Sequence, residues 1–185
     1  MKLLKIIQHP HKTLRKKAEA VSMDTLKSKQ FQEFLDNLMA TLVDKSPFAA
    51  GLSANQVNKL HRVFVVNMEF EDGIEMKQFL INPEIIETSK EMDVDWEGCL
   101  SFNGPEDTPD QWGKVKRSNN IKVKCLDRDG NTLTFTAKDF YARLILHEID
   151  HLNGVLFIDK LASKLLNTEE LEEILGGEEN RSIAG

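Results

Sequence analysis

A five-residue run near the C-terminal end constrains the fold of this chain more than any other feature. His147-Glu148-Ile149-Asp150-His151 falls in a segment predicted to be helical from after Thr136 to about Leu152, with Gly154 as a stop. Residues four apart share one helix face, so both imidazoles can reach a single metal ion. Glu148 could then act on a water at that ion as a general base. The alternative is two histidines with ordinary hydrogen bonds.

A catalytic metal site of this kind needs a third protein ligand. Three other histidines lie in segments with no further metal-binding feature: His9, His11 and His61. Cys125 alternates with Ile121 and Val123, so we expect it to face the core and to be inert. Cys99 follows Gly98, which permits an unusual backbone and close approach. Cys99 with the two histidines of the run makes a site of one thiolate and two imidazoles.

Hydrophobic patterning elsewhere predicts a mixture of helices and strands. Apolar residues between 31 and 43 recur at helical spacing and predict an amphipathic helix from about Ser28 to Lys45, which Pro47 ends. β-Branched and alternating runs predict short strands at 63–66, 79–81, 84–88, 121–125 and 133–135, the last two joined by an Asp129-Gly130 hairpin turn.

The two ends of the chain carry different signals. The first 25 residues read as an extended arm with a short helical turn near Leu14 to Ala18. Asn167 and Glu170 have capping-box spacing and predict a last helix that ends at Gly176-Gly177. Helices and strands do not alternate regularly. We therefore expect an α+β fold, with mostly antiparallel sheets around a central metal-binding helix, an N-terminal amphipathic helix and a C-terminal helix.

Length and composition predict one soluble domain. The chain has 185 residues, for which we expect a single domain over 1–177 and a flexible polar tail over 178–185. The formal charge of −6 argues against a polybasic membrane protein or a general nucleic-acid binder. The sequence shows no long uncharged apolar window, no secretory signal and only two cysteines, so a reducing, cytoplasmic setting is expected.

Three separated motifs resemble those of the peptide deformylases. Ala49 to Gln56 is similar to the family's glycine-rich first motif, Glu97 to Ser101 reads E-G-C-L-S, and His147 to Gly154 reads H-E-x-D-H-L-x-G. Ile7 to Pro10 also resembles the family's N-terminal arm. The resemblance covers roughly residues 5–165, and the three motifs stand in the family's order.

The resemblance implies an N-formyl-methionyl peptide hydrolase that releases formate. It implies that one divalent ion, natively Fe(II) and replaceable by Zn or Ni, is bound by Cys99, His147 and His151. Glu148 would transfer the proton, and the Gln56 amide and the Leu100 backbone N–H would stabilise the oxyanion. Substrate contacts are implied for Ala50, Gly51, Glu97 and Arg117, although an ordinary surface arginine is the alternative for the last. Nascent formyl-methionyl peptides near the ribosome exit are the implied partners, with no membrane, no specific nucleic acid and a monomeric state.

Four features depart from the family pattern. Ala49 and Ser53 replace small motif residues, and Leu146 stands where the family commonly carries glutamine. The segment from Phe102 to Lys116 is longer than in typical bacterial members. It is either a passive surface insertion or a lid beside the metal, with Trp112 as a contact.

Three other functions compete with this interpretation. A zinc peptidase would fit the histidine run, but Phe157 occupies the place where the extended peptidase pattern needs its last histidine. A deformylase-like formyl-peptide-binding protein with weak or no activity would fit the departures, although every ligand and base position is intact. A structural metal site would need a fourth protein ligand, and Cys125 is predicted to face away.

Overall fold

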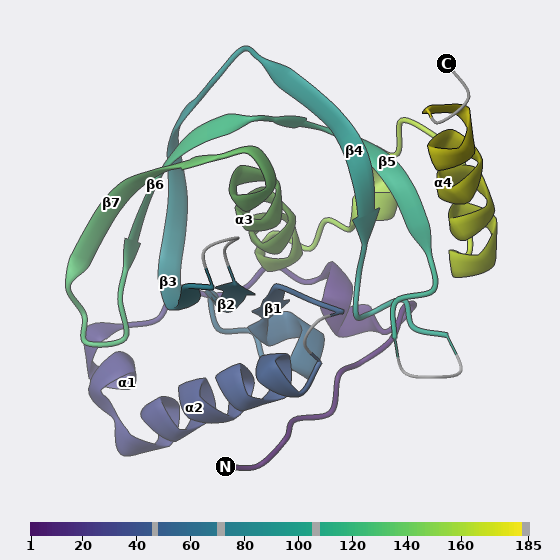
Figure 1. Ribbon diagram of the computed structural model, residues 1–185. Helices are drawn as coiled ribbons and strands as arrows, with labels where there is room; N and C mark the ends of the chain where they lie inside the picture. The colour runs from purple at the N-terminus through teal and green to yellow at the C-terminus, as the bar shows by residue number, and fades with distance from the viewer. Residues whose placement is uncertain (46–47, 70–72, 105–107, 183–185) are drawn as a thin grey trace.

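The computed structural model describes residues 1–45, 48–69, 73–104 and 108–182. The chain forms the predicted α+β fold, with α3 (Asp139–Leu152) in the middle of the molecule. A five-stranded sheet lies on one side of α3 and a two-stranded sheet on the other (Figure 1). None of the described helices is both long and apolar enough to cross a lipid bilayer.

The larger sheet is antiparallel and has the strand order β1-β2-β3-β6-β7. Its strands are β1 (Gly51–Ser53), β2 (Val63–Glu69), β3 (Glu75–Thr88), β6 (Asn120–Leu126) and β7 (Thr132–Lys138). The predicted strands at 79–81 and 84–88 are parts of the single strand β3, and the register shifts between them. The predicted hairpin at Asp129-Gly130 joins β6 to β7. Because β1 is an edge strand, one side of its backbone is not paired within the sheet.

The smaller sheet was not predicted. It pairs β4 (Met92–Gly98) with β5 (Trp112–Ser118), and its last pair is Gly98 with Trp112. Most residues of β4 are exposed, so the strand lacks the apolar run by which buried strands are recognised. The hydrophobic pattern therefore carries little signal for the strand that ends next to Cys99.

Two helices flank the larger sheet at its base. The predicted amphipathic helix is α2 (Lys29–Asp44), and Ser28 caps it by accepting a hydrogen bond from the Phe31 backbone N–H. Its buried face packs Leu38 and Leu42 on Leu52. The short helix α1 (Met23–Lys27) precedes it, in a segment that was expected to be extended apart from one turn. The expected turn near Leu14 forms earlier, as the 3-10 helix η1 (Lys12–Arg15).

The C-terminal helix is longer than expected. α4 (Thr168–Ser182) begins where the capping pair predicts, and the Glu170 backbone N–H donates a hydrogen bond to Asn167 Oδ1 at 2.8 Å. The helix continues past Gly176, because a glycine inside a helix costs only about 1 kcal/mol and does not by itself end it. The expected tail therefore belongs in part to α4, and residues 183–185 lie outside the described residues.

The core packs α3 against the larger sheet. Buried positions of α3 recur three and four apart, and they contact Phe64, Leu80 and Val123 of the sheet; these positions are Ala142, Ile145, Ile149 and Leu152. Gly154 then takes a φ of +74°, which only glycine adopts without strain. A Cβ at this position would lie 2.6 Å from the Arg15 carbonyl oxygen, so α3 ends where the N-terminal arm crosses it.

Replacing Gly154 with alanine should destabilise the fold. A left-handed backbone costs a non-glycine residue roughly 1–2 kcal/mol, and the contact with the Arg15 carbonyl adds to this. Gly176→Ala is the matched control, because a Cβ there meets nothing within 4 Å and a helical Gly→Ala change stabilises by roughly 0.5–1 kcal/mol. Urea denaturation of both variants should give shifts of opposite sign. Equal shifts would contradict this account of how α3 ends.

Candidate metal centre and active site

Three side chains that are far apart in the sequence meet beside α3. Cys99 Sγ lies 3.2 Å from His151 Nε2, which in turn lies 3.2 Å from His147 Nε2. All three residues are buried. Within the described ranges, this is the group of potential ligands whose donor atoms lie within 4.8 Å of one another. The three residues predicted to bind the metal are therefore brought together.

The N-terminal arm and a tight turn position Cys99. The turn closes with a hydrogen bond from Phe102 N to the Cys99 carbonyl at 2.9 Å. Gln8 Nε2 donates to the Leu100 carbonyl at 3.0 Å, and His9 N donates to the Ser101 carbonyl at 2.8 Å. Neither arm contact was predicted, because the sequence of an extended segment does not indicate which distant carbonyl group its hydrogen-bond donors will bind.

The donor set fits a divalent transition metal. One thiolate and two imidazoles suit Fe, Zn or Ni, and three protein ligands leave room for another molecule at the ion. His147 Nδ1 lies 3.0 Å from Glu97 Oε2, which leaves Nε2 turned to the shared centre. Burial lowers the pKa of His151 well below its ordinary value. The neutral ring is the form that binds metals.

Cys125 takes no part in this group. It is buried in the core with Ile121 and Val123, as predicted. Burial raises the pKa of its thiol to about 11. A thiol of this kind stays protonated and unreactive at neutral pH.

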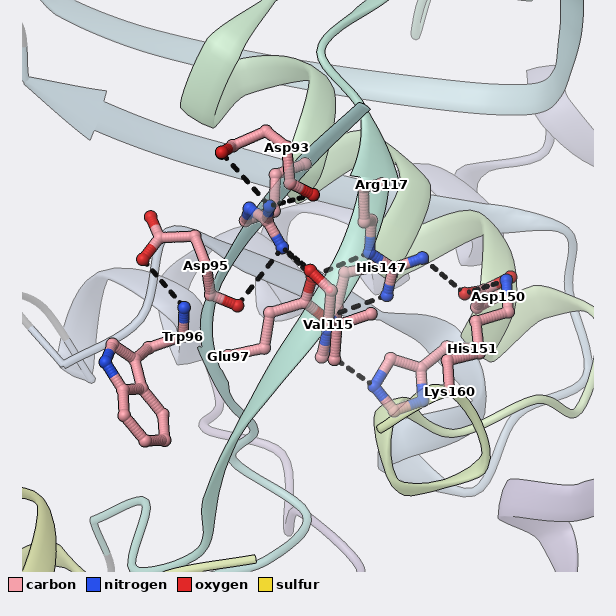
Figure 2. Close-up of polar contacts among 11 residues, drawn as sticks. Asp93, Asp95, Trp96, Glu97, Val115, Arg117, His147, Asp150, His151 and Lys160 are labelled. Carbon is pink, nitrogen blue, oxygen red and sulfur yellow. Dashed lines mark hydrogen bonds and ion pairs between the residues drawn. The ribbon is translucent and has the colours of Figure 1, made fainter. Parts of the chain in front are cut away.

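A buried carboxylate supports the histidines from behind. Glu97 receives hydrogen bonds from Arg117 Nε at 2.6 Å and Nη2 at 2.8 Å (Figure 2). Arg143 Nη1 donates a further hydrogen bond to Glu97 at 2.8 Å. Burial alone would raise the pKa of Glu97, but the bonds from Arg117 and His147 hold it below its usual range. The ionised carboxylate fixes the ring orientation of His147.

Arg117 lies behind Glu97 and not in the cleft described below. Its side chain is 3% exposed, and its remaining nitrogen, Nη1, donates to Asp150 at 2.6 Å. Asp150 also pairs with Lys160 at 2.7 Å. Arg117 is therefore a buried member of an ion-pair network. It is not the solvated surface arginine of the alternative, and it does not line the cleft in which a substrate contact was implied.

Arg143 belongs to this site and was missed in the sequence. It lies one helical turn before His147 on α3, so its i, i+4 spacing to a ligand was the available signal. Besides Glu97, its guanidinium donates to the Val115 carbonyl at 2.8 Å and the Asp93 carbonyl at 3.2 Å. Arg143 thus ties α3 to both strands of the smaller sheet.

Glu148 is buried beside the metal ligands. Its carboxylate accepts a hydrogen bond from the Ser53 hydroxyl, so the serine that departs from the family pattern orients it. A Cβ on Gly51 would lie 2.6 Å from Glu148 Oε1, so the carboxylate requires glycine there. Burial raises the pKa of Glu148, against opposing effects from His147 and Ser53. A raised pKa suits a group that both accepts and donates a proton.

The two residues implied in oxyanion stabilisation border the same centre. Gln56 is buried, and its Nε2 lies 3.5 Å from Cys99 Sγ and 3.3 Å from Ser101 Oγ. Its Oε1 accepts a hydrogen bond from Ser53 N at 2.9 Å, which fixes the amide orientation. Leu100 directly follows Cys99 and is also buried.

A cleft of about 260 Å³ opens onto these groups. It is lined by Glu148, His147, Cys99, Gln56 and Leu100, by Ala50, Gly51 and Glu97, and by the buried Leu144. A more exposed, apolar outer part includes Phe48, Trp96, Trp112 and Phe140. Of the implied substrate-contacting residues, three line the cleft and Arg117 does not. Clefts with apolar walls and a few convergent polar groups are typical ligand sites.

The long segment after the cysteine turn borders the cleft in part. Pro109 and Trp112 line the cleft, and Asp110 N donates to the Phe102 carbonyl at 3.0 Å. Residues 105–107 of the expected lid lie outside the described residues.

Comparison with known proteins agrees with this geometry. The family model described as polypeptide deformylase matches residues 3–166. "Peptide deformylase 2" of a Nostoc species is 38% identical, over 94% of this chain and 95% of that protein. "Peptide deformylase 1" of Bacillus subtilis is 36% identical, over 95% of this chain and all of that protein. A Met-Ala-Ser-bound class I type b peptide deformylase from Acinetobacter baumannii superposes with a TM-score of 0.76 at 34% identity, covering 86% of this chain and 98% of that one. The chain belongs to the polypeptide deformylase family.

Proposed function

We propose that this protein removes the N-formyl group from the terminal formyl-methionine of newly made polypeptides and releases formate. The observation that carries the proposal is the convergence of Cys99, His147 and His151 beside an apolar cleft that Cys99, His147 and Glu148 line. A buried proton-transfer group beside a metal-ligand set is what amide hydrolysis requires. An apolar cleft fits a methionine side chain.

Cys99, His147 and His151 would hold one divalent ion, natively Fe(II), for which Zn or Ni can substitute. Such an ion makes a water molecule more acidic and polarises a carbonyl oxygen. Glu97 keeps His147 oriented for this task from the side away from the ion.

The chain's own residues handle the proton and the developing charge. Glu148 takes a proton from the attacking water as its oxygen bonds to the formyl carbon. The Gln56 amide and the Leu100 N–H stabilise the negative charge on the former carbonyl oxygen. The bond between the formyl carbon and nitrogen then breaks, and Glu148 gives its proton to the amine. Ala50 and Gly51, beside the free edge of β1, would contact the peptide backbone as an added strand does.

The physiological setting follows from the substrate. Nascent chains carry the formyl group, so the enzyme would act in the cytoplasm near the ribosome exit. The monomeric state is part of the same proposal.

The competing functions differ in product and are separated by one assay. Anaerobically purified protein should contain bound metal and release formate from formyl-Met-Ala-Ser. Cleavage of an internal peptide bond would indicate a peptidase instead, and tight binding without turnover would indicate a formyl-peptide-binding protein.

The two cysteines provide a test of the metal site. Cys99→Ala should lose metal and activity together, because a thiolate ligand is removed. Cys125→Ala is the matched control and should keep both within a few-fold, because Cys125 lies in the core away from the ligands. Metal analysis of both purified variants checks this. Equal metal loss in the two variants would contradict the assignment.

Replacing Glu148 with glutamine should separate chemistry from metal binding. Glutamine has nearly the same shape but cannot accept the proton, and positioned proton transfer contributes about 10²–10⁴-fold, so kcat should fall by at least that range. Metal content should persist. Single-turnover formate release with metal analysis makes the measurement. Near-normal turnover would refute the proposed role, and loss of metal would make Glu148 a ligand or a structural residue.

A further inference from the structure

The outer part of the cleft is aromatic. Both tryptophans of the chain, Trp96 and Trp112, line it together with Phe48 and Phe140. Phe48 and Phe140 are 59% and 57% exposed, which is unusual for aromatic side chains. Exposed aromatic groups gathered at one opening indicate a surface that binds apolar groups.

Trp112 stands out because its ring is held in place beside the reacting centre. Trp112 is paired with Gly98 at the end of the smaller sheet, one residue before the ligand Cys99. A Cβ on Gly98 would lie 2.6–2.9 Å from three atoms of the indole ring, so the ring packs directly on the glycine backbone. The same ring borders the cleft.

The start of the C-terminal helix fixes the other edge of the indole. Trp112 Nε1 donates to Thr168 Oγ1 at 3.0 Å, and Thr168 Oγ1 donates to the Pro109 carbonyl at 3.2 Å. The Trp112 and Leu166 backbones exchange two hydrogen bonds of 2.8 Å each. Figure 1 shows α4 beside β5, on the side of the molecule away from β7. These contacts hold a large apolar surface rigid before any ligand binds, which reduces the entropic cost of binding.

We propose that Trp112 is a specificity residue for the substrate and that Thr168 is its positioning residue. The indole binds an apolar side chain of the peptide downstream of the formylated residue, so formyl-peptides with a bulky apolar residue there are preferred. This inference rests on the proposed deformylase function. It gives the C-terminal helix a part in substrate selection.

The test is a KM-against-kcat comparison with the metal-loaded enzyme. Formyl-Met-Ala-Ser is varied so that its second or third residue is glycine or leucine. The wild type should prefer leucine at one of these positions, and Trp112→Ala should raise KM for that peptide by about tenfold, with kcat and the KM of the glycine peptide within about twofold. An unchanged leucine preference at both positions would overturn the proposal.

Variants of Thr168 test the positioning role. Thr168→Val removes the acceptor of the indole N–H and should weaken the leucine preference by about threefold, whereas Thr168→Ser keeps the hydroxyl and should restore it. Thr134→Val is the matched control, since Thr134 is exposed on β7, which does not line the cleft. If Trp112→Ala fails to fold, Trp112→Phe takes its place. Phenylalanine has no indole N–H, so Thr168→Val should not change the leucine preference of the Trp112→Phe variant. Equal effects of the Thr168 and Thr134 changes would overturn the positioning role.

A binding measurement separates this inference from the proposed function. Trp96→Phe leaves Trp112 as the only tryptophan. Titration with the unformylated peptide carrying leucine should shift its fluorescence, and the glycine peptide should bind more weakly. This readout does not need turnover. A fluorescence shift without formate release would reject the proposed activity and support the peptide contact. Formate release without a fluorescence shift would support the proposed activity and reject the peptide contact.

Discussion

The rest of the site depends on the hydrogen bonds and ion pairs that the buried Glu97 carboxylate makes. This carboxylate comes from β4, and it is bound by Arg117 of β5 and by Arg143 and His147 of α3. One charge therefore ties both strands of the smaller sheet to the helix that carries the metal ligands. Loss of one partner from a buried ion pair costs about 3–5 kcal/mol, because the other charge is left without compensation. Two arginines bind this carboxylate, and their charges keep it ionised. The ionised carboxylate in turn keeps the His147 ring oriented.

This arrangement explains why the smaller sheet is joined to α3 at all. The exposed residues of β4 bury little apolar surface, so hydrophobic packing alone gives the strand little reason to lie here. The guanidinium of Arg143 supplies the missing attachment by binding carbonyl groups on both strands. The same attachment brings the end of β4, and so Cys99, to the histidines. The metal centre is thus assembled by a polar network, while the packing of α3 on the larger sheet supplies its rigid base.

Much of the fold was predictable because it follows from periodicity. The stripe of α2, the alternation in β6 and β7, and the apolar positions of α3 each repeat over many residues, and such patterns indicate the element directly. Prediction failed where the signal was short or polar. The strands β1, β4 and β5 carry no such pattern, the two parts of β3 were separated at a register shift, and Gly176 did not end α4. In the sheets, tertiary pairing outweighed the local preference, whereas at Gly176 the cost of a helical glycine was too small to end the helix.

The sequence by itself determined which residues are available for the chemistry. The i, i+4 histidines with their glutamate, and a cysteine beside a glycine, specify a ligand set because helix geometry and ligand chemistry are local properties. Only the tertiary structure decided what surrounds that set. It placed Arg117 behind Glu97 and away from the cleft, made Arg143 part of the network, turned Ser53 toward Glu148 and fixed Trp112 by the C-terminal helix. Those contacts join segments far apart in the chain, and no local pattern records which distant donor meets which acceptor.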